Sequence, residues 1–75
     1  MKIRKLRVGQ TATVIGYDRG ERAYRHKLLR MGLIKGATFT LTRRAPLGDP
    51  IELQLRGFSL LLRRDEADVL EVELS

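Results

Sequence analysis

The chain has 75 residues, with 15 Lys and Arg against 9 Asp and Glu, one His and no Cys or Trp. This length supports one domain with a thin core, and the lack of Cys excludes disulfides, cysteine zinc sites and thiol chemistry. No apolar run approaches the about 20 residues of a membrane-spanning helix, and neither a glycine-rich phosphate loop nor an activated nucleophile is present, which argues against an enzyme.

The net charge of +6 is unevenly spread along the chain. Residues 1–35 carry 10 basic and 2 acidic side chains, whereas residues 36–75 carry 5 basic and 7 acidic ones. A positive field of this kind attracts nucleic acid, an anionic membrane surface or an acidic protein. Residues 1–7 are expected to form a basic N-terminal tail, and no apolar run follows them, so they do not indicate a secretory signal.

Residues 11–17 are rich in β-branched side chains and predict the first strand. Gly16 within this run indicates a bulge or a close approach of the backbone. Asp18 and Glu21 then have the spacing of an N-terminal capping box, which predicts a helix over residues 19–31.

The expected helix has an apolar face and a basic face. Spacings of three and four residues place one apolar stripe toward the core, formed by Tyr24, Leu28 and Met31 and widened by Leu29. A spacing of four aligns the basic side chains of Arg22, His26 and Arg30. Gly32 predicts the end of the helix, because glycine readily adopts the left-handed conformation found there.

From Gly36 onward the hydrophobic period changes from helical to two, which is typical of strands. The expected strands cover residues 38–44, 51–55, 58–62 and 70–74. A turn is expected at 46–50 and a short helical turn at 64–68. Phe39 and Phe58 occupy apolar positions of this alternation, and we expect both to be buried.

These elements predict a mainly β fold, a small antiparallel barrel of about five strands within a single domain over residues 1–75. One α-helix is inserted after the first strand, and a short helical turn precedes the last strand. In such a barrel the last strand can pair with the first.

Two segments carry a resemblance to a known family. They are R-H-K-L-L-R-M-G-L-I-K-G at residues 25–36 and A-P-L-G-D-P-I at residues 45–51. In this order they resemble FeoA, the small cytosolic partner of the bacterial ferrous-iron transporter FeoB, over residues 8–74. The second segment is the more specific of the two. The family usually has Pro before the glycine of the second turn, where this chain has Lys35, which loosens the turn and adds a charge.

The resemblance implies an SH3-like barrel, a cytoplasmic location and a role in ferrous iron uptake through binding of FeoB. FeoB carries a cytosolic GTP-binding domain, and FeoA is expected to modulate the transporter rather than to carry iron. Similar domains follow the DNA-binding domain of iron-dependent repressors, which this chain is too short to contain. The oligomeric state stays open.

Two groups of residues are the candidate partner-binding elements. The first is the solvent face of the helix, namely Arg22, Arg25, His26 and Arg30. The second is the turn formed by Pro46, Leu47, Gly48 and Asp49, whose prolines restrict its conformations and so reduce the entropy lost on docking. Leu47 either anchors a partner or folds back over the barrel, and the sequence leaves both open.

No catalytic residue, cofactor or tight metal site is expected. The acidic residues near the C-terminus are Asp65, Glu66, Asp68, Glu71 and Glu73. Oxygen ligands alone hold ferrous iron weakly, so these residues are interpreted as an acidic solvated region. The alternative function is a small basic barrel that binds nucleic acid, although the few aromatic residues provide no stacking platform for single strands.

Overall fold

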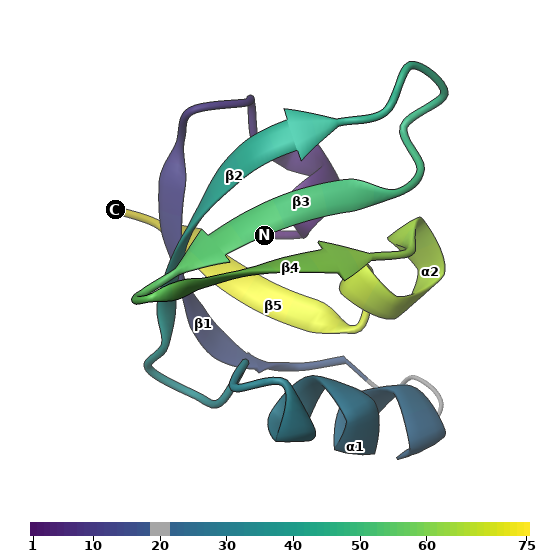
Figure 1. Cartoon of the computed structure of the whole chain (residues 1–75). Coiled ribbons are helices and arrows are strands. Elements are labelled where there is room, and N and C mark those ends of the chain that lie inside the picture. The colour runs from purple at the N-terminus through teal and green to yellow at the C-terminus, as the bar shows by residue number, and fades with distance from the viewer. Residues whose placement is uncertain (19–21) are drawn as a thin grey trace.

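The computed structural model of the protein describes residues 1–18 and 22–75 (Figure 1). A short 3₁₀ helix at Ile3–Lys5 precedes the first strand. The strands are β1 (Thr11–Tyr17), β2 (Thr38–Arg44), β3 (Ile51–Leu55), β4 (Phe58–Leu62) and β5 (Leu70–Leu74). The helices are α1 (Arg22–Arg30), between β1 and β2, and α2 (Arg64–Ala67), between β4 and β5.

The five strands form one antiparallel sheet in the order β4-β3-β2-β1-β5. The register of β1 against β5 shifts between Val14 and Gly16, which confirms the bulge expected at this glycine. A second shift lies between Leu41 and Arg43 in β2. Bulges of this kind bend strands and increase their twist, which lets five short strands curl around a common core (Figure 1). The mainly β architecture and the pairing of the first strand with the last are confirmed.

The core forms where the alternating apolar side chains of the strands meet. Phe39 and Leu41 of β2 and Leu53 of β3 are buried, as the two-residue period requires. The expectation that Phe58 is buried is wrong, because its side chain is 44% exposed at the start of the edge strand β4. Its ring instead lies over Gly32, where a Cβ atom would come within 3.3 Å of it.

Helix α1 covers one end of the sheet (Figure 1). Leu28 is fully buried, and Tyr24 and Met31 pack against the core while staying partly exposed. Leu29 belongs to the exposed side. Gly32 has a φ of +93° immediately after the helix, as the sequence predicts. The expected start at residue 19 and the capping position 21 lie outside the described residues.

The first seven residues do not form the separate basic tail that the sequence suggests. Ile3 and Leu6 are buried in the core, and Lys2 forms a bridge with Glu71 of β5. The 3₁₀ turn explains this arrangement, because it directs two apolar residues three apart inward while the intervening Arg4 and Lys5 stay exposed.

Candidate partner-binding surfaces

The basic face of α1 is open to solvent. Arg22, His26 and Arg30 are exposed, and no carboxylate among the described residues lies within ion-pair distance of them. Arg25 is also exposed, but its guanidinium lies 5.2 Å from the centre of the Tyr17 ring. This cation–π contact holds Arg25 close to β1, while the other three side chains are available to a partner.

Tyr17 also secures the chain after α1. Its hydroxyl donates a hydrogen bond of 2.6 Å to the carbonyl oxygen of Leu33. Burial raises the pKa of the Tyr17 hydroxyl, against the opposing effect of the nearby Arg25 charge. The hydroxyl therefore remains a neutral donor at physiological pH and fixes the position of the α1–β2 connection.

Helices α1 and α2 are joined by an ion pair. Lys27 Nζ donates to Glu66 Oε2, and Arg63 N donates to Glu66 Oε1 over 3.1 Å. The hydrogen bond from Lys27 lowers the pKa of Glu66, and the Arg63 N–H adds to this effect, whereas burial acts in the opposite direction. Glu66 is thus an ionised, buried carboxylate whose charge is balanced by α1.

The β2–β3 loop is held at its base and exposes its tip. Ala45 N donates to the Pro50 carbonyl over 3.0 Å, and Gly48 N donates to the Ala45 carbonyl over 2.7 Å. Asp49 Oδ1 accepts a 3.1 Å hydrogen bond from Arg64 N at the start of α2. Leu47 is 90% exposed, so it does not fold back over the barrel. An apolar side chain is therefore presented on a fixed backbone.

The two predicted elements do not form one patch. In Figure 1 the β2–β3 loop and α1 lie at opposite ends of the molecule, and α2 lies between them. Asp49 contacts the start of α2, and Lys27 of α1 contacts Glu66 of the same helix. Helix α2 is therefore the structural link between two separate exposed elements.

A cleft of about 230 Å³ adjoins the β2–β3 loop and was not predicted from the sequence. Its walls carry three arginines, Arg4, Arg44 and Arg64, and we call it the arginine cleft. The remaining lining residues are Ile3, Gly48, Ile51, Ala67 and Asp68. These residues come from the N-terminal segment, the loop and its flanking strands, and α2, so no local sequence pattern could have indicated their proximity.

An apolar groove lies at the other end of β3, also without a signal in the sequence. Ile34 is 54% exposed there and lies near Phe58, and Lys35 and Arg56 stand at the edge. The groove has a volume of about 420 Å³. The misassigned Phe58 is the reason that the groove was missed, because a buried Phe58 would have left no apolar wall.

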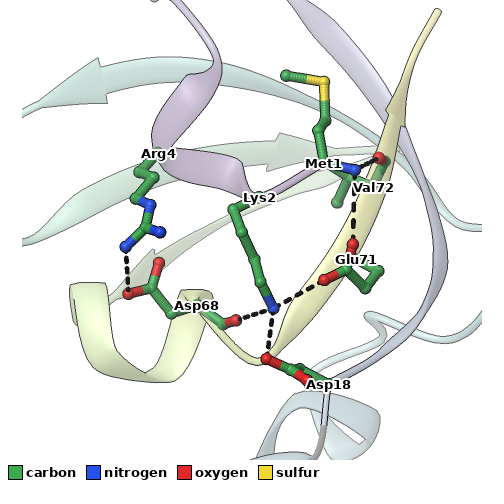
Figure 2. A network of polar contacts seen from close by, with 7 residues as sticks. All are labelled: Met1, Lys2, Arg4, Asp18, Asp68, Glu71 and Val72. Carbon is green, nitrogen blue, oxygen red and sulfur yellow. Dashed lines mark hydrogen bonds and ion pairs between the residues drawn. The ribbon is translucent and has the colours of Figure 1, made fainter.

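Lys2 is the centre of a polar network that ties the N-terminal segment to the fold (Figure 2). Its ammonium lies 2.8 Å from a carboxylate oxygen of Asp18 and 2.8 Å from one of Glu71. It also donates to the carbonyl oxygen of Asp68 over 2.8 Å. These three acceptors match the three donors of an ammonium group.

Two shifted pKa values reflect this network. Burial of the Lys2 ammonium opposes its charge, but the hydrogen bonds and charges of Asp18 and Glu71 outweigh burial and raise the pKa of Lys2. The hydrogen bond from Lys2 lowers the pKa of Glu71. Both groups are therefore charged across the physiological range, and the network persists there.

Three of the five acidic residues near the C-terminus already have cationic partners. Glu66 pairs with Lys27, Glu71 pairs with Lys2, and Asp68 lies 3.8 Å from Arg4. Within residues 1–18 and 22–75, no three His, Asp or Glu side chains are grouped so that they could hold a metal ion. No helix in the described part of the chain is long and apolar enough to cross a membrane.

A family model and a curated relative both match almost the whole chain. The family model of the FeoA domain matches residues 1–74 and so includes the N-terminal segment. A FeoA/FeoB fusion protein of Porphyromonas gingivalis, named an Fe(2+) transport protein A/Fe(2+) transporter FeoB fusion, is 34% identical over 74 residues. The match covers 99% of this chain and 9% of the fusion protein, so the chain spans less than a tenth of that relative.

Solved structures agree with this result. The FeoA protein of Chlorobium tepidum has a TM-score of 0.88 and 40% identity, and the match covers 99% of this chain and 70% of that one. FeoA of Stenotrophomonas maltophilia, solved with zinc and described as a procaryotic SH3 domain protein, has a TM-score of 0.82 and 25% identity. That match covers 97% of this chain and 89% of the other. The fold is therefore SH3-like, as the sequence resemblance implied.

Proposed function

Because the chain belongs to the FeoA family, which is associated with ferrous iron transport, we propose that it is a cytoplasmic accessory protein that binds and modulates a FeoB-type membrane GTPase transporter. The observation that carries this proposal is the fusion protein of Porphyromonas gingivalis, in which a domain similar to this whole chain shares one polypeptide with FeoB. Covalent linkage raises the effective concentration of two modules that act together. A FeoA domain on a polypeptide of its own would need non-covalent binding in place of that linkage.

The form of the molecule supports a binding role. The β2–β3 loop presents Leu47 on a backbone held by Asp49, so docking would order little additional chain. The exposed side chains of Arg22, His26 and Arg30 offer a second contact for an acidic surface. These two elements can contact a large partner at opposite ends of the small domain.

A catalytic role has little support. The buried carboxylate Glu66 is neutralised by Lys27, and the carboxylate of Glu71 is hydrogen-bonded by Lys2. The pKa of each carboxyl group is lowered, whereas a carboxyl group tuned for acid–base catalysis at neutral pH has a raised pKa. We therefore assign the protein a modulating rather than a chemical role in iron uptake.

The proposal is tested by titrating the ¹⁵N-labelled protein with the cytosolic region of a FeoB-type transporter. The titration is run without nucleotide, with GDP and with a non-hydrolysable GTP analogue. We expect localised amide shifts in at least one nucleotide state. Absence of shifts in all three states would overturn the proposal. A parallel titration with double-stranded DNA at increasing salt tests the alternative, because nucleic-acid binding weakens steeply with salt.

A further inference from the structure

The lining residues of the arginine cleft carry an excess of positive charge. Among its lining residues, three guanidinium groups face the single carboxylate of Asp68. Arg4 lies 3.8 Å from Asp68 Oδ2, which is beyond a normal hydrogen bond. Within the described part of the chain, no carboxylate lies at ion-pair distance from Arg44 or Arg64. The cleft is therefore complementary to an anion.

The arginines retain donors for a ligand. Arg44 uses Nη2 to donate to the Leu6 carbonyl over 3.1 Å, which positions its guanidinium and leaves most of its five N–H groups available. Arg64 Nη1 lies 4.0 Å from the point where a Cβ on Gly48 would be. The Arg64 guanidinium therefore lies next to the β2–β3 loop at Gly48.

Apolar residues also line the cleft, and an exposed apolar side chain lies next to it in the chain. Ile3, Ile51 and Ala67 are buried and offer a ligand almost no surface, whereas Leu47, next to the lining residue Gly48, is fully available. A free phosphate or a nucleic-acid backbone would satisfy the arginines but make no use of the exposed Leu47 side chain. A polypeptide that alternates carboxylate and apolar side chains would contact both kinds of group.

From this combination we propose that the arginine cleft, together with Leu47, binds an acidic segment of a protein partner. A Glu or Asp carboxylate of that segment accepts hydrogen bonds from Arg64 and Arg44, and a neighbouring apolar side chain packs against Leu47. This inference rests on the proposed function. It specifies where the partner binds and which chemical groups of the partner make the contact. Separate experiments test whether the cleft binds acidic peptides and whether the protein binds the transporter through it.

The first experiment uses a synthetic blocked peptide of alternating glutamate and leucine, titrated into the ¹⁵N-labelled protein. The control peptide has glutamine in place of every glutamate. We expect the acidic peptide to shift the amides of Gly48, Arg64 and Ala67 and the control peptide to bind much more weakly. Equal binding of the two peptides, or shifts confined to other surfaces, would overturn the inference.

Two variants of this protein locate the charge. Arg64→Gln should weaken binding of the acidic peptide by roughly tenfold, the loss expected for a charged hydrogen bond. Arg56→Gln removes the same charge from the β3–β4 turn, away from the cleft, and should leave the affinity unchanged. An equal loss of affinity in both variants would show that binding depends only on the net charge of the protein, which would contradict a specific site.

Inorganic phosphate and DNA are titrated in the same way. If either shifts the same amides as strongly as the peptide, a protein segment is not the specific ligand of the cleft.

The same variants are then titrated with the cytosolic region of a FeoB-type transporter. Weaker binding by Arg64→Gln than by Arg56→Gln supports the cleft as the contact. If the parent protein binds but both variants bind equally well, the cleft inference fails while the proposed function stands. If the parent does not bind at all, the proposed function fails, and the peptide titration alone decides whether the cleft accepts acidic segments.

Discussion

The N-terminal segment and the β2–β3 loop are both short and irregular, but they use their side chains in opposite ways. Residues 1–6 bury Ile3 and Leu6 and direct the Lys2 ammonium to three acceptors in the body of the fold (Figure 2). Residues 45–50 are held by hydrogen bonds among their own backbone groups and by the Asp49 carboxylate, which accepts from Arg64 N, and they leave Leu47 in solvent.

This contrast separates stability from recognition. A segment whose side chains point inward supplies free energy of folding to a domain that has little to spare. A loop whose backbone is fixed and whose side chain points outward contributes little to stability and offers a preformed contact. Changes in the first region should therefore alter the unfolding transition, and changes in the second should alter binding.

The largest effect is expected from Leu6→Ala, with Leu47→Ala as its matched control. Truncating the buried Leu6 should lower the free energy of unfolding by about 2–5 kcal/mol. Truncating the exposed Leu47 should change it by less than about 0.5 kcal/mol. Urea denaturation of both variants measures the difference. If Leu6→Ala unfolds at the parental midpoint, the N-terminal segment does not belong to the core.

A smaller loss of stability is expected from Lys2→Met. This change removes three polar contacts but keeps an apolar stem of similar length, and two of the partners are substantially exposed. We expect a loss of about 1–2 kcal/mol. Lys5→Met, in the same segment and exposed, is the control and should have almost no effect. Equal midpoints for the two variants would show that the network does not stabilise the fold.

Some features of the fold could be predicted from the sequence and others could not. Strand and helix periods predicted the elements, and Gly16 and Gly32 marked a bulge and a helix end, because these features depend on residues close together in the chain. The burial of Ile3 and Leu6 was missed because the surrounding basic residues concealed a short apolar spacing. Phe58 was misplaced because its alternation was right but its strand lies at the edge of the sheet.

The candidate site was predictable only in part. The turn at 46–50 and the basic face of α1 follow from local composition, but the sequence left the exposure of Leu47 open. The structure shows that the two elements lie far apart (Figure 1). The arginine cleft depends on the approach of Arg4, Arg44 and Arg64, which are distant in the chain. No local pattern carries that information, since it arises only when the sheet has curled.

The third prediction concerns the anchor of the loop. Asp49→Ala removes the carboxylate that accepts the Arg64 N–H, and it should cost about 1 kcal/mol of unfolding free energy. Asp49→Asn keeps an acceptor and should cost less. Thermal unfolding of the two variants provides the comparison. A greater loss with asparagine than with alanine would mean that the hydrogen bond does not hold the loop.

The smallest effect is a dependence of stability on acid pH. Hydrogen bonds from Lys27 and Lys2 lower the pKa values of Glu66 and Glu71 below the ordinary value of 4.5. Their contribution is therefore present above that pH and is lost as the pH falls through the lowered values. Urea midpoints should decrease between about pH 7 and about pH 3, and the decrease should be smaller in Lys27→Met. A midpoint that rises on acidification would contradict these assignments.

The central claim is that the β2–β3 loop is a recognition element on a fold that the N-terminal segment stabilises. Calorimetric titration of Leu47→Ser and the parent protein with the cytosolic region of a FeoB-type transporter tests it most directly. The account predicts a substantial loss of affinity in a variant that unfolds at the parental temperature. Unchanged affinity of the folded variant would contradict it.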